Sequence, residues 1–342
     1  MLSSFAFSTG SHGWAVAQDE GLQATTDGGR DWRPCTGRIV GVPTSGSDTL
    51  PTSVDRLPSP AQVLGVGSSL FLTYYASSAG GGAQPSAATS SGILVSADQG
   101  VTWRRLRSLA PSRDSVLYLA ASDARHLWAL CAPGPPGSPG PTYLLRSANA
   151  GASWSRLPDA GIGMPGRVGF GSPFTFVDAR HGWSWFVPFS GVAMAEVRTT
   201  VDGGLSWRKA TQPKGSGLGA FALDALHAWT PAKPAPGSGA LYATGDGGKS
   251  WRSEPQFAHL PPSAVYFADV RHGWVVFADS SSGGGIMATS DGGRRWGKEL
   301  SASGPVWGSP GWTFERAGNT LFLGSSDGGG LYARTLQSGS AQ

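Results

Sequence analysis

The sequence predicts an all-β protein: a β-propeller of seven four-stranded antiparallel blades, with a last blade that is one strand short. Three observations predict this fold. An eight-residue segment recurs six times, a short turn motif precedes most of its copies, and helical periodicity is sustained nowhere. Glycine and proline, 52 and 25 of 342 residues, also suit a chain with many turns between short strands.

The recurring segment, here called the box, has Ser or Thr first, Asp or Asn third, Gly fifth and Trp eighth. Its copies are TTDGGRDW (25–32), SADQGVTW (96–103), SANAGASW (147–154), TVDGGLSW (200–207), TGDGGKSW (244–251) and TSDGGRRW (289–296). The third positions lie 44 to 71 residues apart, which is the range of propeller blades.

The second motif, here called the Asp–His turn, precedes four of the boxes. It reads DARHLW (123–128), DARHGW (178–183), DALHAW (224–229) and DVRHGW (269–274), with GSHGW (10–14) as a truncated copy. Apolar residues lead into and out of this motif, which predicts a strand, a tight turn and a second strand. A third strand then leads into the box, and a fourth begins at its Trp.

These units place seven blades along the chain. They lie near residues 3–36, 62–108, 115–157, 170–210, 219–254, 263–301 and 308–336. We expect one propeller domain over 1–336 and a disordered tail at 337–342. The last blade is irregular, because its segment 325–332 fits a turn between the second and third strands. The chain begins directly at a first strand, so we expect it to lack an upstream strand or to be truncated relative to the working protein.

We predict a structural role for the box. Its carboxylate can accept hydrogen bonds from backbone N–H groups of its own turn and from the hydroxyl two positions earlier. The fifth-position glycine suits a positive φ. The Trp would pack between blades and contribute at most about 4–6 kcal/mol when fully buried. The residues assigned this role are Asp27, Trp32, Asp98, Trp103, Asn149, Trp154, Asp202, Trp207, Asp246, Trp251, Asp291 and Trp296.

A metal site is the rival explanation of the repeated aspartates. Asn149 replaces the carboxylate in one copy, and no box reliably supplies a second acidic ligand. The histidines are repeated in the same way, since five of the six occupy one position of the Asp–His turn, which favours a structural role for them as well. We therefore expect them to cap hairpins, and we expect no catalytic residue, metal or cofactor in either motif.

Composition excludes other classes. The net charge is +4 with 14% charged residues, and no dense Lys/Arg run marks a nucleic-acid surface. No apolar stretch approaches the roughly 18 residues of a membrane helix, and no signal peptide is evident. Cys35 and Cys131 form no metal spacing and no disulfide framework.

Strand alternation places both motifs on one face of the propeller, the turn face. The opposite face, the loop face, carries the second-to-third turns and the connections between blades, including 37–61, and most of these are Gly, Pro, Ser and Ala. A glycosidase needs two carboxylates about 5–10 Å apart. The loop-face candidates are Asp114 with Asp159, Glu254 with Asp279, and Arg167. Of the tryptophans, Trp185, Trp307 and Trp312 lie outside the motifs, and either a carbohydrate platform or core packing accounts for them.

The box resembles the Asp-box, or bacterial neuraminidase repeat, of sialidases, xyloglucanases and sortilin-type receptors. Combined with the His-Gly-Trp turn, the pattern is most similar to the photosystem II stability/assembly factor family of seven-bladed propellers and its bacterial relatives. This resemblance implies a protein partner and an extracytoplasmic or envelope location. Arg38-Ile39-Val40 matches only the first two residues of the Arg-Ile-Pro motif of sialidases.

The sequence thus favours a monomeric, non-catalytic scaffold or assembly factor that binds a protein. A carbohydrate-active hydrolase of sialidase or glucanase type, or a sugar-binding propeller using the loop face, is the alternative. Enzymatic activity is left open, with the scarcity of catalytic groups weighing against it.

Overall fold

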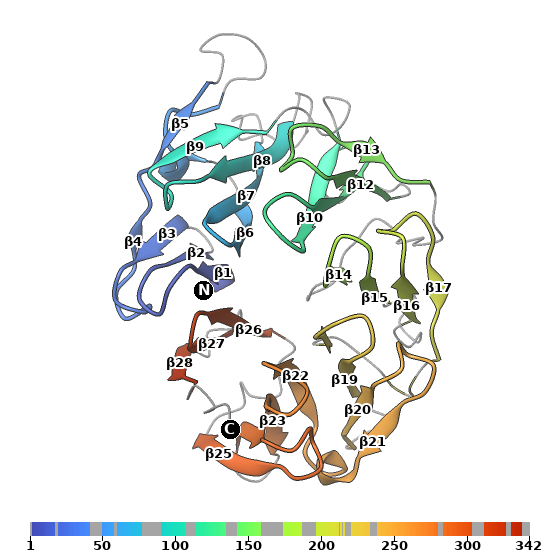
Figure 1. The fold of residues 1–342 in the computed structure, drawn as a ribbon. Coiled ribbons are helices and arrows are strands. Elements are labelled where there is room, and N and C mark those ends of the chain that lie inside the picture. Colours follow the sequence, from blue (N-terminus) through green and yellow to red (C-terminus); the bar gives the residue numbers. More distant parts are fainter. Residues whose placement is uncertain are drawn as a thin grey trace, which may run out of the picture. The chain divides into compact units, whose positions relative to one another are not determined.

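The computed structural model of the protein describes residues 2–17, 20–41, 50–57, 60–76, 90–106, 114–134, 142–158, 174–186, 196–211, 213, 215, 220–232, 238–279, 283–302, 311–325 and 330–336. The strands form seven sheets, numbered blades 1 to 7 in chain order (Figure 1). Two 3-10 helices, η1 (Val54–Arg56) and η2 (Pro255–Phe257), lie in the described part, where no helix is long and apolar enough to cross a membrane.

The first three blades hold the following strands. Blade 1 has β1 (Leu2–Phe7), β2 (Gly13–Ala17), β3 (Gly21–Thr25) and β4 (Arg33–Pro34). Blade 2 has β5 (Arg38–Val40), β6 (Pro60–Val66), β7 (Ser69–Ala76), β8 (Ser90–Ser96) and β9 (Thr102–Arg105). Blade 3 has β10 (Ser115–Ala121), β11 (Leu127–Ala132), β12 (Tyr143–Ser147) and β13 (Ser155–Arg156).

The remaining four blades continue the same meander. Blade 4 has β14 (Phe174–Phe176), β15 (Gly182–Phe186), β16 (Glu196–Thr200) and β17 (Arg208–Lys209). Blade 5 has β18 (Phe221–Ala222), β19 (Ala228–Ala232), β20 (Ala240–Thr244) and β21 (Arg252–Glu254). Blade 6 has β22 (Pro262–Phe267), β23 (Gly273–Asp279), β24 (Gly283–Thr289) and β25 (Gly297–Ala302), and blade 7 has β26 (Trp312–Ala317), β27 (Thr320–Ser325) and β28 (Leu331–Thr335).

The predicted fold class is confirmed: the protein is a seven-bladed β-propeller with antiparallel blades, and its last blade has three strands. The chain divides into two compact units. Unit 1 comprises Met1–Asp159, Glu315–Phe322 and Leu331–Gln342, and unit 2 comprises Ala160–Phe314 and Leu323–Gly330. The single domain over 1–336 stays a prediction, and the tail at 337–342 lies outside the described residues.

Blade 2 differs from the prediction by a fifth strand. The sequence placed 37–61 in a connection, but β5 pairs in parallel with the outer strand β9. Ile39 is the buried residue of β5 and joins a core cluster with Val54 and Trp103. Because this strand covers the edge of the blade, Trp103 is fully buried, whereas the other five box tryptophans are half-buried. The box tryptophans are therefore not equally buried, and the upper limit of about 4–6 kcal/mol applies to Trp103 alone among them.

Neighbouring blades are joined by side chains of their innermost strands. In unit 1, Ser4 Oγ both donates to Val63 O (3.0 Å) and accepts from Val63 N (3.1 Å). Gln62 bridges to blade 3 in the same way, because its amide bonds both N and O of Leu119 at 2.9 and 3.0 Å. The bridged residues Val63 and Leu119 lie on β6 and β10, the end strands of their sheets, which pair with a strand on one side only.

Aromatic stacking adds to these junctions. Within unit 1, Phe7 of blade 1 stacks on Phe322 of blade 7, with ring centroids 3.6 Å apart. Within unit 2, Trp229 of blade 5 stacks on Phe267 of blade 6 at the same separation. Such pairs contribute about 0.5–1.5 kcal/mol beyond the area they bury, so they help to fix one blade against the next.

Candidate functional site

The box folds as a hydrogen-bonded turn, as the sequence predicts. In blade 1, Asp27 Oδ1 accepts hydrogen bonds from Thr25 Oγ1 (2.8 Å) and from the N–H groups of Arg30 (2.9 Å) and Asp31 (3.0 Å). Thr25 Oγ1 in turn accepts from Gly29 N at 3.0 Å. The backbone bond from Asp31 and the hydroxyl of Thr25 lower the pKa of Asp27, because both stabilise the ionised form.

The same bonds recur in the other copies. In blade 5 they are supplemented by Ser250 Oγ, 2.6 Å from Asp246 Oδ2, and this bond is the main reason that the pKa of Asp246 falls to about 2. Asn149 fills the role without a charge: its Oδ1 accepts from Ser147 Oγ and Ser153 N, and its Nδ2 donates to Ser153 Oγ (all 2.9 Å). The turn therefore needs hydrogen-bonding atoms and not a negative charge.

Two consecutive box positions adopt the left-handed region. The fourth has φ of 73–78° in its glycine copies and 58° in Gln99 and Ala150, and the fifth has φ of 79–92° throughout. Only the fifth is glycine in all copies, and packing supplies the reason. A Cβ on Gly151 would overlap the Leu106 side chain of the preceding blade, and one on Gly248 would lie 2.9 Å from Ala210 Cβ.

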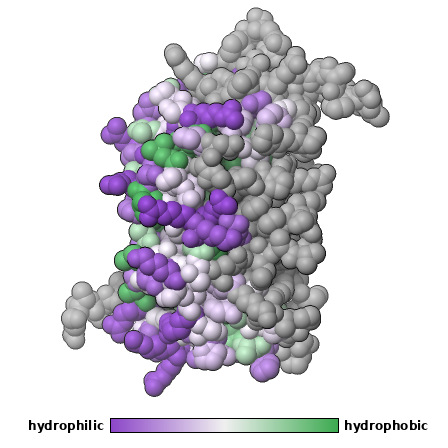
Figure 2. Space-filling view, turned by 90° about the vertical axis from the view of Figure 1, so that its right-hand side faces the viewer, coloured by the Kyte–Doolittle hydropathy of each residue, from purple (hydrophilic) through white to green (hydrophobic). Residues whose placement is uncertain are grey.

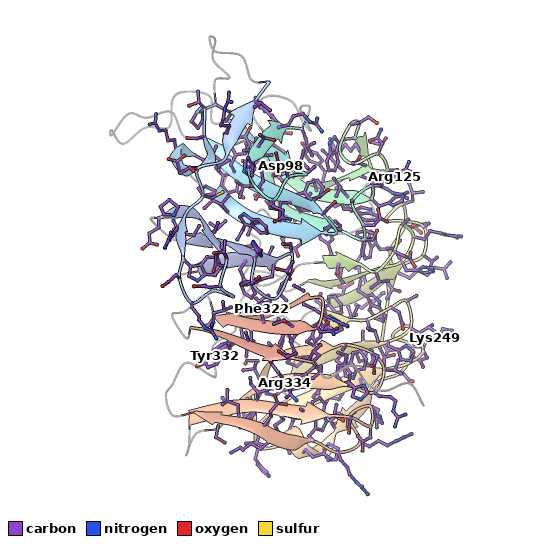
Figure 3. The ribbon with its side chains drawn as sticks, turned by 60° about the vertical axis from the view of Figure 1, so that its left-hand side comes forward. Asp98, Arg125, Lys249, Phe322, Tyr332 and Arg334 are labelled. Carbon is purple, nitrogen blue, oxygen red and sulfur yellow. The ribbon has the colours of Figure 1, made fainter. Side chains whose placement is uncertain are left out.

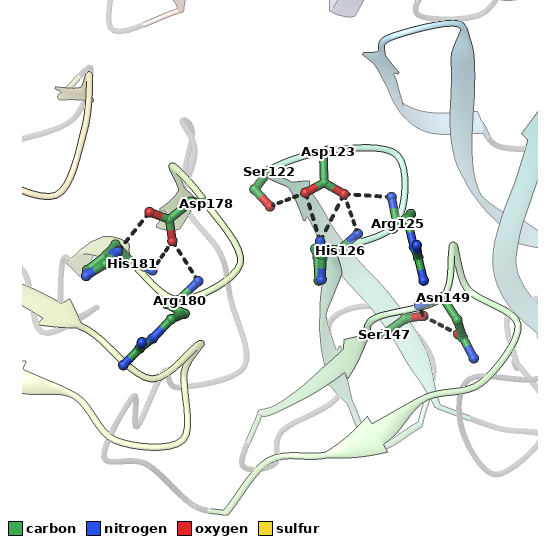
Figure 4. Close-up of polar contacts among 9 residues, drawn as sticks. All are labelled: Ser122, Asp123, Arg125, His126, Ser147, Asn149, Asp178, Arg180 and His181. Atoms are coloured by element: carbon green, nitrogen blue, oxygen red, sulfur yellow. Dashed lines mark hydrogen bonds and ion pairs between the residues drawn. The ribbon is translucent and has the colours of Figure 1, made fainter.

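The Asp–His turn is also closed by its own side chains (Figure 4). Asp123 Oδ1 accepts from the N–H groups of Arg125 (2.8 Å) and His126 (2.9 Å), and Asp123 Oδ2 lies 2.8 Å from His126 Nδ1. Burial alone would raise the pKa of Asp123, but the bonds from the His126 side chain and the two N–H groups lower it. Asp178 and His181 form the same ring of bonds in blade 4.

In five blades a backbone hydrogen bond joins the box to the Asp–His turn or its truncated copy. The N–H at the fourth box position donates to the carbonyl of the residue before the histidine. The bonds are Gly28 N to Ser11 O (2.9 Å), Ala150 N to Arg125 O (2.9 Å), Gly203 N to Arg180 O (2.7 Å), Gly247 N to Leu226 O (3.0 Å) and Gly292 N to Arg271 O (2.9 Å). This bond places box and turn on the same side of their blade, as predicted.

The loop-face candidates are not brought together where they are described. Asp114, at the start of blade 3, accepts a 2.5 Å hydrogen bond from Tyr143 Oη, and the Arg156 guanidinium lies 4.3 Å from the centroid of the Tyr143 ring. Burial and the bond to Asp114 raise the pKa of Tyr143. Sequence reasoning missed this pair, since 29 residues separate its members and no motif contains them.

The other candidates give no pair of free carboxylates. Asp159 and Arg167 lie outside the described residues, and Asp279 is described only as the last residue of β23. Both free tryptophans that are described, Trp185 and Trp312, are buried, which favours core packing over a carbohydrate platform, and Trp307 lies outside the described residues. Within the described ranges, no group of three or more His, Cys, Asp or Glu could hold a metal ion, and both cysteines are buried and free.

Glu254 is a buried carboxylate within the repeat. It lies three residues after its box Trp, a position that is apolar in blades 1 to 4 (Cys35, Leu106, Leu157 and Ala210) and again glutamate in blade 6 (Glu299). Its side chain is 2% exposed. A Cβ on Gly293 of blade 6 would lie 3.1 Å from Glu254 Oε1, and Arg252 Nη2 lies 2.8 Å from the same oxygen. Burial raises the pKa of Glu254 to about 7, although Arg252 opposes that rise.

Comparison with known proteins agrees with this architecture. YCF48 from Cyanidioschyzon merolae matches over 98% of this chain and 95% of its own, with 16% identity and a TM-score of 0.56. YCF48 bound to a D1 peptide matches over 98% and 93%, with 15% identity and a TM-score of 0.54. The likeness shows a shared propeller fold.

A second kind of neighbour is enzymatic. The GH74 xyloglucanase from Xanthomonas campestris matches over all of this chain, with 17% identity and a TM-score of 0.58, and the chain spans 53% of that enzyme. No family model matches the sequence, and no curated protein matches it either. At these identities the neighbours establish the fold, and function has to be argued from the side chains.

Proposed function

We propose that the protein is a non-catalytic propeller that binds a polypeptide partner and acts as an interaction or assembly scaffold. The observation that carries this proposal is the commitment of the repeated Asp and His side chains to their own turns. In blade 3, for instance, both oxygens of Asp123 and Nδ1 of His126 are used within four residues. Side chains bound in this way fix the backbone of their own turns, and among the described residues no group of three or more His, Cys, Asp or Glu gathers as a metal site would require.

Two described residues of the loop face bear on the hydrolase alternative. The Tyr143 hydroxyl donates to Asp114, a carboxylate placed as the base of a tyrosine nucleophile would be, but the raised pKa of Tyr143 opposes its ionisation at neutral pH. Glu254 is enclosed between two blades and pairs with Arg252, so it does not face substrate. The likeness to YCF48, which has been observed with a bound D1 peptide, supports a polypeptide as the partner class.

In the view of Figure 2, hydrophilic side chains cover most of the described part, and hydrophobic residues lie singly among them. We further propose that the twelve predicted box residues are structural, that 1–336 folds as one monomeric domain, and that the protein works outside the cytoplasm or in the cell envelope. The family resemblance of its two motifs supports that location.

Two measurements test the proposal, one on the purified full chain and one in the source cells. Hydrolysis of sialosides, xyloglucan and β-glucans should stay at the level of the buffer blank. Chemical cross-linking in the source cells, followed by mass spectrometry, should recover a polypeptide partner that is absent when a blade-destabilised Gly151→Ala variant is used. Hydrolysis abolished by Asp114→Asn or Glu254→Gln would instead establish the glycoside hydrolase, and saturable binding on a glycan array without a protein partner would establish the sugar-binding propeller.

A further inference from the structure

Blade 2 lacks the bond that joins box and hairpin in the five blades described above. Its fourth box position is Gln99, and the N–H of Gln99 donates to no acceptor among the described residues. The cause is the first hairpin of this blade. β6 and β7 are joined by a two-residue turn, Gly67-Ser68, where the other blades with a described box have the longer Asp–His turn or its truncated copy. The carbonyl that would accept the bond is therefore missing.

The short hairpin leaves a hollow of about 370 Å³ within unit 1, here called the blade 2 notch. Trp14, Leu70 and Val101 form its apolar lining, and Gln99 and Asp98 lie on the box side. Val101 is 65% exposed, more than any other large hydrophobic residue described. Asp98 is engaged in its own turn by Thr102 and Ser96, and Figure 3 marks its position at the end of the blade 2 strands.

The backbone at Gln99 already has the conformation of a bonded copy. Its φ is 58°, the same as that of Ala150 in blade 3, whose N–H donates to Arg125 O at 2.9 Å. A ligand that completes this arrangement must supply a carbonyl oxygen at that place and an apolar group over Val101. A polypeptide turn supplies such a carbonyl, as the turns of the other five blades do within the same chain, and an apolar side chain on a partner's turn would supply the second contact.

We propose that the blade 2 notch binds a turn of a partner polypeptide, whose backbone carbonyl accepts the hydrogen bond from Gln99 and whose apolar side chain covers Val101. This inference rests on the proposed function and names the surface and the chemistry of its partner. The N–H of Gln99 can bond water in the free protein, so its bond to the partner's carbonyl adds little to the free energy of binding. We expect this bond mainly to set the register of the bound turn. Burial of Val101 supplies most of the affinity.

The probe is a peptide copied from the protein's own blade 3 turn, AASDARHLWA (residues 120–129), closed by a disulfide between added terminal cysteines and labelled with fluorescein. Anisotropy should show saturable binding to the wild-type chain. Val101→Ser should weaken it about tenfold, because the aliphatic contact is lost. Leu205→Ser is the matched control: Leu205 holds the same box position in blade 4, is 49% exposed and lies in unit 2, so its replacement should leave binding unchanged.

Two further measurements locate the bound peptide. Hydrogen exchange at the Gln99 amide should slow when the peptide is present. Replacing Gly67-Ser68 by the six residues Ser-Asp-Ala-Arg-His-Gly should fill the notch, raise the melting temperature and abolish binding. If that graft does not fold, Val101→Ser and the exchange at Gln99 decide the question. Absent binding, equal effects of the two serine variants, or unchanged exchange at Gln99 would each overturn the inference, whereas a partner cross-linked at another surface would still support the proposed function.

Discussion

Replacing Glu254 by leucine should make the protein more stable at pH 8 and leave its stability at pH 4.5 almost unchanged. Leucine is the residue at the equivalent position of blades 2 and 3 (Leu106 and Leu157). Glu254 is buried with a pKa near 7, compared with 4.5 for the free side chain. The folded state therefore holds the proton more tightly than the unfolded state. The stability that this proton contributes is present below pH 4.5 and declines as the pH rises to about 7.

The size of the effect follows from that difference. Each pKa unit corresponds to about 1.4 kcal/mol, so ionisation of Glu254 costs the folded state about 3 kcal/mol above pH 7. The opposing attraction of Arg252 is already included in that pKa, so it is not subtracted again. For a chain of 342 residues that unfolds in one step, the gain raises the melting temperature at pH 8 by about 4 °C.

The assay is urea unfolding of the wild type and of Glu254→Leu at half-unit steps between pH 4.5 and 8. Leu157→Glu is the matched control, because it introduces the same carboxylate at the same repeat position in blade 3 and should create a second decline of stability over that range. Equal pH profiles of Glu254→Leu and the wild type would refute the reasoning, since Glu254 would then titrate as an exposed group.

Three other predictions concern the repeat. Gly151→Ala should destabilise by about 2–4 kcal/mol in urea unfolding, because φ is +80° and the added methyl overlaps a leucine of the preceding blade, whereas Gly297→Ala, with no atom within 4 Å of its Cβ, should have no such effect. Trp103→Ala should lower the free energy of unfolding by about 3–5 kcal/mol, and Trp154→Ala should lower it clearly less, because only Trp103 is covered by β5. Equal losses in urea unfolding would contradict that role of β5. Asn149→Asp should change the free energy of unfolding by less than about 0.5 kcal/mol, and a chelator should not alter its melting curve; a stability that depended on calcium would reveal a metal site.

The architecture could be predicted because its signal is repeated. Six boxes at blade spacing fix the third and fourth strands, and the Asp–His turn fixes the first two. The three-stranded last blade also followed from the irregular segment 325–332. β5 could not be predicted, since three residues between Gly- and Pro-containing segments give no strand pattern, and its burial depends on contact with Trp103 far along the chain.

The site residues were less predictable. The pairing of Asp114 with Tyr143 is a tertiary contact without a local pattern. Glu254 did have a signal, because the position three residues after the box Trp is apolar in blades 1 to 4 and glutamate in blades 5 and 6, but alignment of the repeat had to be carried past the Trp to find it. The blade 2 notch also had a signal in the sequence, because the segment 62–108 contains a box without an Asp–His turn.

The ionisation of the box carboxylate in blade 5 is the most direct test of the view that recurring acidic side chains serve the turns. Carbon-13 NMR titration of the Asp246 carboxyl should give a pKa of about 2, since Ser250, Thr244 and Lys249 hold its oxygens by hydrogen bonds. A value near the ordinary 3.8 would show that these bonds do not form in solution, and the carboxylate would then be free for other chemistry.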